Sequence, residues 1–162
     1  MKKSKAFLSL IFFIFLISEI SIAQDKMKIA VLYFNNVSEG TTYSNYVEGL
    51  PEMLMKHLGK SNKIHIIGKE QIDKALRHFE IEKSDFLNEP TALKAGKWVG
   101  ADAIILGNFS TKDKNVRIDV WIVNCESGTL INSAKVQDHL KNLNNLVDNL
   151  AEEILNALSR VS

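Results

Sequence analysis

Apolar residues along the chain follow distinct periods, and each period predicts one type of element. Two continuous apolar runs, 28–34 and 102–107, have no helical period and predict strands buried on both faces; 64–67 predicts a short strand between them. Pro51 falls inside the first helical segment, so it either kinks that helix or begins its second part. Amphipathic helices are predicted over 43–58, 69–79, 91–99 and 143–158.

Toward the C-terminus the pattern becomes that of a hairpin. Residues 116–123 alternate between two unlike faces, the segment 126–128 is a tight turn, and 129–136 returns as a partner strand. The resulting order is β-α-β-α-α-β-β-β-α. Helical connections favour parallel pairing of the early strands. The sequence therefore predicts an α/β fold with a mixed, mostly central-parallel sheet, a C-terminal antiparallel hairpin, and helices packed on the sheet.

The N-terminus has the three parts of a secretory signal. Three lysines precede an apolar run over 6–17, and Ser21-Ile22-Ala23 places small residues before a cut at Gln24. The alternative is a membrane anchor, but a spanning helix needs roughly 20 apolar residues. We therefore expect residues 1–23 to be a signal peptide and 24–162 to be a single domain.

The residue after the predicted cut argues against a lipid anchor. A bacterial lipoprotein carries Cys there, and this chain has Gln24. No later segment is apolar enough to span a membrane. We expect an exported protein without a lipid anchor or a membrane span, located in the periplasm of a Gram-negative cell.

The net charge and the number of cysteines limit the kinds of partner and bond that this chain can form. The formal net charge is +1, and the predicted signal peptide removes three Lys and one Glu, which leaves a nearly neutral domain. A neutral surface gives no reason to expect nucleic acid or an anionic membrane as partner. The single Cys125 excludes a disulfide within the chain.

Sequence motifs do not indicate catalysis. The Gly-Lys-Ser at 59–61 lacks the earlier Gly of a phosphate-binding loop, because Leu54 stands there. No two of the four histidines have the i, i+4 spacing of a helical metal pair, and Cys125 has no motif of a nucleophile around it. We predict no catalytic, cofactor or metal site, and an enzyme such as an exported hydrolase is the least supported alternative.

Two segments are candidates for binding. Trp121 lies on the strand face that carries Arg117; an exposed face would indicate an interface, whereas a covering last helix would make Trp121 part of the core. The loop with Asn35, Asn36 and Ser38 follows the first central strand, where open α/β sheets bind ligands, although an ordinary polar turn has the same composition.

Four segments together resemble the CsgG-type family of bacterial periplasmic domains, with its FlgO-like, TolB amino-terminal and LpoB-like relatives. They are 29–38 (IAVLYFNNVS), 67–76 (IGKEQIDKAL), 99–109 (VGADAIILGNF) and 122–130 (IVNCESGTL). The resemblance implies a cell-envelope protein without enzymatic activity. CsgG is the outer-membrane secretion channel for curli subunits, but this chain lacks the lipidated Cys and extra hairpins, so an adaptor or assembly role is expected.

Two functional hypotheses follow. In the first, the domain binds another envelope protein, or itself, in secretion or surface-structure assembly. In the second, it binds or senses a small ligand through the loop after the first strand.

Overall fold

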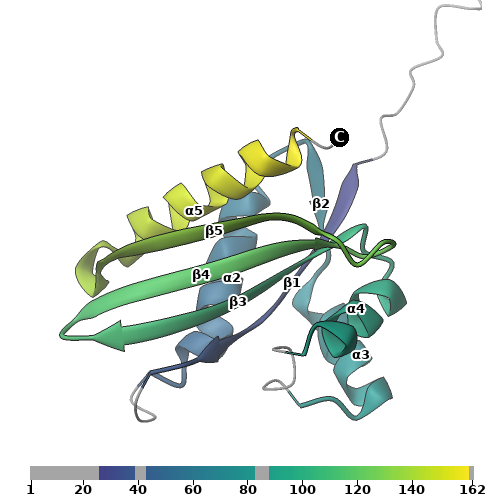
Figure 1. Ribbon diagram of the computed structural model, residues 1–162, viewed down its shortest axis with the longest axis horizontal. Helices are drawn as coiled ribbons and strands as arrows, with labels where there is room; N and C mark the ends of the chain where they lie inside the picture. The colour runs from purple at the N-terminus through teal and green to yellow at the C-terminus, as the bar shows by residue number, and fades with distance from the viewer. Residues whose placement is uncertain (1–25, 39–42, 83–87, 161–162) are drawn as a thin grey trace, which may run out of the picture.

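One mixed β-sheet with helices on both faces organises the molecule (Figure 1). The computed structural model describes residues 26–38, 43–82 and 88–160, and the predicted signal peptide lies outside them. The predicted order of strands and helices is confirmed. The elements are β1 (Met27–Asn36), α2 (Tyr46–Leu58), β2 (Ile64–Ile66), α3 (Lys69–Phe79), α4 (Glu89–Trp98), β3 (Ala103–Lys112), β4 (Asn115–Asn124), β5 (Leu130–His139), the 3-10 turn η2 (Leu140–Asn142) and α5 (Leu143–Leu158).

The strands lie in the order β2-β1-β3-β4-β5. Strand β1 pairs in parallel with β2 and β3, whereas β3-β4 and β4-β5 are antiparallel. This arrangement confirms the predicted mixed sheet. Strand β3 continues to Lys112, beyond the predicted run that ended at Gly107. The apolar pattern stops early because Asn108 and Ser110 lie on the part of the α3/α4 face that the described helices do not reach, where polar side chains are tolerated.

Each face of the sheet has its own hydrophobic core. Helices α2 and α5 pack on one face, and α3 and α4 pack on the other. The alternation in β4 explains the division, because its inward set is fully buried beneath α5. That set is Val116, Ile118, Val120 and Ile122, each 0% exposed.

A bulge in β1 changes which side chains face which core. The register with β3 shifts between Val31 and Phe34, so Leu32 and Tyr33 both join the α3/α4 core and Phe34 returns to the α2/α5 core. Phe34 then lies opposite Gly107. A Cβ on Gly107 would lie 2.7 Å from the Phe34 ring, so this ring fits only because its neighbour has no side chain.

Helix α4 approaches the sheet closely at Gly96. A Cβ there would lie 2.4 Å from Cγ2 of Ile104 and 3.0 Å from Sγ of Cys125. Gly96 therefore allows the close packing of α4 on the sheet.

Helix α2 runs through Pro51 without beginning a new helix there, since it starts at Tyr46 and Pro51 is buried within it. Among the residues that the structure describes, no helix combines the length and apolar content needed to cross a bilayer.

An ion pair joins α2 to α5, and its carboxylate is expected to make the free energy of unfolding fall at acidic pH. Asp148 Oδ1 lies 2.5 Å from His57 Nδ1 and 3.6 Å from Lys60 Nζ. The hydrogen bond from His57 and the charge of Lys60 lower the pKa of Asp148. A lowered pKa gives stability that is present above the ordinary carboxyl pKa of about 3.9 and is lost as pH falls through the folded-state value.

We therefore expect Asp148→Asn to reduce the urea midpoint at about pH 6, and we expect this effect to shrink as pH falls through the lowered folded-state pKa of the carboxyl group. Urea unfolding at several pH values measures the difference. The matched control is Glu152→Gln on the same helix, for which no such pH-dependent difference is expected. A pH-independent effect of Asp148→Asn would contradict the role of this carboxylate.

Candidate protein-interaction surface

Helices α3 and α4 cover only one end of their sheet face. In Figure 1 they lie at one end of the sheet, while β3, β4 and β5 extend away from them toward the β3-β4 turn. We call the uncovered region the open sheet face. Its side chains are exposed or half-buried and mostly polar. They are Asn108 and Ser110 of β3, Arg117, Asp119 and Trp121 of β4, and Ser133, Lys135 and Gln137 of β5.

A fixed pair of charges lies at the centre of the open sheet face. Arg117 donates from Nε and Nη2 to the two carboxylate oxygens of Asp119, each at 2.8 Å. The hydrogen bonds to Asp119 raise the pKa of Arg117. Lys135 stands directly opposite Asp119 on the next strand. The fork geometry favours one orientation of the guanidinium.

Arg117 also borders a shallow hollow near the β3-β4 turn. The hollow encloses about 180 Å³, and its lining is wholly polar. The lining residues are Ser110, Lys112, Asp113, Asn115, Arg117 and Gln137. The two residues of the β3-β4 turn, Asp113 and Lys114, both adopt positive φ. The tight turn between the two strands therefore determines the backbone shape at this end of the sheet.

Trp121 occupies the boundary between the open sheet face and the α3/α4 core. The last helix covers the opposite face of β4, so α5 does not bury this side chain. Trp121 is half-buried, packs against the α3/α4 core and lies between Leu106 and Ser133 on the neighbouring strands. Sequence analysis posed core and interface as alternatives; Trp121 lies half-buried at the edge of the α3/α4 core, and its role in an interface stays a prediction.

The loop after β1 is tied to β3. Asn36 Oδ1 accepts from the Ser38 backbone N–H at 2.9 Å, and Ser38 Oγ accepts from the Thr111 N–H at 2.8 Å. Asn35 is 9% exposed and pairs in register with Asn108. These contacts use the polar groups of Asn36 and Ser38 within the protein. Residues 39–42 of the predicted turn lie outside the described residues.

Side chains near the carboxyl ends of β1 and β2 form hydrogen bonds with one another and with α2. Tyr33 Oη donates to Asp73 Oδ1 at 2.5 Å, and burial with this bond raises the pKa of Tyr33. Lys69 donates to Glu48 at 2.8 Å and to Glu52 at 2.5 Å, which raises the pKa of Lys69. The Lys69 contacts connect α3 with α2, which lie on opposite faces of the sheet.

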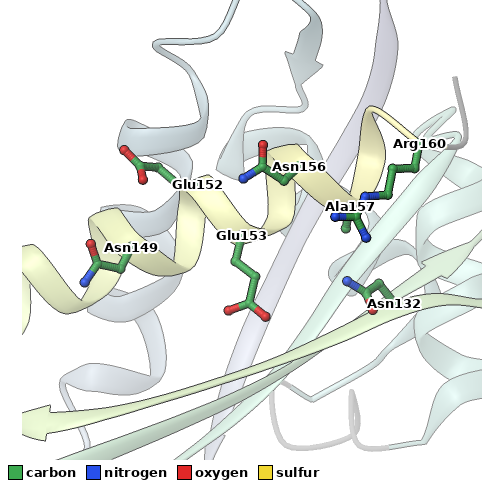
Figure 2. A pocket seen from close by; sticks show the side chains of 7 residues that line it. All are labelled: Asn132, Asn149, Glu152, Glu153, Asn156, Ala157 and Arg160. Atoms are coloured by element: carbon green, nitrogen blue, oxygen red, sulfur yellow. The ribbon is translucent and has the colours of Figure 1, made fainter.

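A second hollow, which the sequence analysis did not predict, runs between α5 and the outer strand β5 (Figure 2). We call it the β5 groove; it encloses about 400 Å³. In Figure 2 Glu153 points from α5 toward β5, and Asn132 points from β5 toward the helix. The groove is lined by Asn132, Asn149, Glu152, Glu153, Asn156, Ala157 and Arg160. Adjacent glutamates on an amphipathic helix indicate only a solvated helix face, because the position of α5 along β5 is a tertiary property.

Reactive groups are not assembled into a catalytic centre in the part of the chain described. Cys125 is 2% exposed, and burial raises the pKa of its thiol to about 11, so it remains a protonated thiol at neutral pH. Among the described residues, no group of His, Cys, Asp and Glu side chains is arranged to hold a metal ion. The surface features that stand out are therefore a sheet face, a strand edge and the β5 groove.

Comparison with known proteins identifies a family and a shared fold. The family model described as "Curli production assembly/transport component CsgG" matches residues 14–141. No curated protein sequence matches the chain closely enough to be counted as a relative.

Solved structures share the fold at low sequence identity. The LpoB C-terminal domain from Salmonella enterica has a TM-score of 0.58 at 19% identity, with 75% of this chain and 91% of that chain covered. Lipoprotein GNA1162 from Neisseria meningitidis has a TM-score of 0.61 at 16% identity, covering 81% and 98%. TolB from Acinetobacter baumannii has a TM-score of 0.56 at 13% identity, covering 82% of this chain and 28% of TolB.

Proposed function

Because the chain belongs to the CsgG family of curli production assembly/transport components, we propose that it is a non-enzymatic periplasmic protein that binds another cell-envelope protein through the open sheet face. The family match confirms the resemblance carried by the four sequence segments. In this proposal the signal peptide 1–23 directs export, the mature chain begins at Gln24 without a lipid anchor, and the complex takes part in secretion or in building a surface structure.

The observation that carries the proposal is the composition of the open sheet face. It combines a half-buried Trp121 with Arg117, which its carboxylate partner holds in place. Trp and Arg dominate the binding energy of protein interfaces, especially when they are held in one conformation before binding. The surrounding Ser133, Lys135 and Gln137 form a polar rim, as interfaces commonly have.

The small-ligand alternative is less well supported. It would use Asn35, Asn36 and Ser38, and the acceptors of Asn36 and Ser38 already receive hydrogen bonds within the protein. The two hollows described above are lined by other residues. We therefore favour protein binding.

Site-directed photo-cross-linking in intact cells tests the interaction. A photoreactive amino acid at Gln137 or Ser110 is expected to cross-link the full-length, exported protein to a defined envelope protein. The matched control is the same amino acid at Lys56, an exposed position on α2 on the other side of the sheet. Equal cross-linking from Lys56, or none from either position on the open sheet face, would overturn the proposed binding surface.

Cell fractionation tests the proposed location. Osmotic shock is expected to release the full-length product with periplasmic marker proteins, and a version without residues 1–23 is expected to stay in the cytoplasm. Metabolic labelling with a fatty acid should leave the protein unlabelled. Release of the shortened version by osmotic shock, or incorporation of the fatty acid, would contradict the assignment.

A further inference from the structure

Strand β5 lies at the edge of the sheet, so one side of its backbone has no neighbouring strand among the described residues. The Leu140 N–H donates to the Lys114 carbonyl at 2.8 Å, which sets the hydrogen-bonding phase between β4 and β5. In an antiparallel ladder, residues that bond to the partner strand alternate with residues whose backbone groups point away from it. The residues of β5 that present their N–H and C=O groups outward are therefore Ser133, Lys135 and Gln137.

This edge is long and regular. Strand β5 has 10 residues, and its register with β4 is continuous from His139 to Asn132. The other edge strand, β2, has 3 residues. Proteins usually protect a long edge with proline, a bulge, a covering element or a charged side chain. The regular part of β5 contains neither proline nor a bulge, and its mid-strand protection is limited to Lys135, so its backbone can still accept an added strand.

The β5 groove lies beside this edge, and its charged lining residues are two glutamates and one arginine, which give it a net negative charge. Glu153 points toward β5 in Figure 2, and neither Glu152 nor Glu153 forms an ion pair with the described residues. Arg160 lies at one end of the groove, near Asn132. In a strand added to β5, every second side chain would face the α5 side of the sheet. Lysine or arginine at those positions would meet the carboxylate of Glu153, whereas Glu152 points away from β5 in Figure 2.

A second copy of the same chain fits this edge poorly. A two-fold dimer places the same patch of both subunits against each other. Pairing β5 with β5 would bring two acidic grooves together, and a register centred on Lys135 would also oppose two lysines. Like charges at such positions are destabilising. The charges therefore favour a different chain with basic side chains.

We propose that the β5 edge binds an extended segment of the partner by strand addition, with Lys or Arg at alternate positions reaching Glu153 in the β5 groove. The inference rests on the proposed function and specifies how the partner is held. Backbone bonds to Ser133, Lys135 and Gln137 supply the sequence-independent part of the binding, and the β5 groove selects basic side chains.

Peptide binding to the mature protein tests the proposal directly. The probe is a capped synthetic peptide of about eight residues that alternates Lys and Thr, and its matched control alternates Glu and Thr. We expect the Lys peptide to bind at least about tenfold more tightly in calorimetry, and to slow amide hydrogen exchange at Ser133, Lys135 and Gln137. Equal binding of the two peptides, or no protection at these amides, would overturn it.

Two variants separate backbone pairing from charge. Lys135→Pro removes an outward N–H that β4 does not use, and Lys135→Thr keeps that N–H while removing the charge. We expect at least about a tenfold loss of peptide affinity for the proline variant and less than about a twofold change for the threonine variant. Should Lys135→Pro unfold the strand, Glu153→Lys provides an independent test with the same expected loss. Its control is Asn145→Lys, an exposed change on α5 outside the groove.

The cellular cross-links distinguish failure of this inference from failure of the proposed function. If cross-links from Gln137 persist unchanged in both Lys135→Pro and Glu153→Lys, a partner binds but strand addition is wrong. If the wild-type protein gives no cross-links, the proposed function itself fails. Protection of the β5 amides that appears without peptide and disappears on dilution would identify a second copy as the occupant and would also overturn the proposal.

Discussion

Replacing Phe34 by Ala is expected to lower the free energy of unfolding by about 3–5 kcal/mol. The ring is 1% exposed and lies in the α2/α5 core, where its removal leaves a cavity between β1, β3 and the helices. The β1 bulge directs Phe34 to this position, so a different side chain cannot swing into the space without changing the register. Urea or thermal unfolding monitored by circular dichroism measures the loss.

A double-mutant cycle with Gly107 identifies the cause. In the wild-type background, Gly107→Ala is expected to cost about 1–3 kcal/mol, because the new methyl would lie 2.7 Å from the Phe34 ring. In the Phe34→Ala background the same change should cost little, since the ring is gone. If the two changes were additive, the close approach of ring and glycine would not be the source of the effect.

The second large effect is expected at Gly96. Gly96→Ala should lower the free energy of unfolding by about 1–3 kcal/mol even though alanine has the higher helix propensity. The new Cβ would lie 2.4 Å from Ile104 Cγ2 and 3.0 Å from Cys125 Sγ. Both neighbours are buried in the α3/α4 core, so α4 must move away from β3 to make room.

Gly49 is the matched control for this prediction. It lies inside α2, and a Cβ built there meets nothing within 4 Å. Gly49→Ala should therefore raise the free energy of unfolding by about 0.5–1 kcal/mol, through helix propensity alone. The same chemical change is thus expected to have opposite signs in two helices. Destabilisation of similar size at both positions would show that contact with Ile104 does not decide the outcome.

Local sequence patterns were sufficient for the order of elements and for the class of sheet. Continuous apolar runs become central strands because both faces are covered, as in β1 between its two cores. The alternating run becomes β4 because only one of its faces is under a helix. The apolar pattern did not predict the second half of β3. This half carries Asn108 and Ser110 on the open sheet face, so its sequence resembles that of a loop.

The candidate surface was only partly predictable. Arg117 and Trp121 attracted attention because an aromatic and a charged residue share a strand face, and that face proved to be open at Arg117. The β5 groove left no local signal, because Asn132 and Glu153 are ordinary polar residues in separate elements. Their proximity depends on α5 crossing back over β5.

Periodicity and turn chemistry, which act over a few residues, were enough to specify the strands, the helices and the hairpin, together with the predicted export signal. Which helix covers which face depended on packing between segments far apart in the chain. Helix α5 buries the apolar set of β4 on one side, and this choice leaves Trp121 and Arg117 on the other. The same packing makes β5 an edge beside an acidic groove, a property that no stretch of sequence contains, because it arises only when distant elements meet.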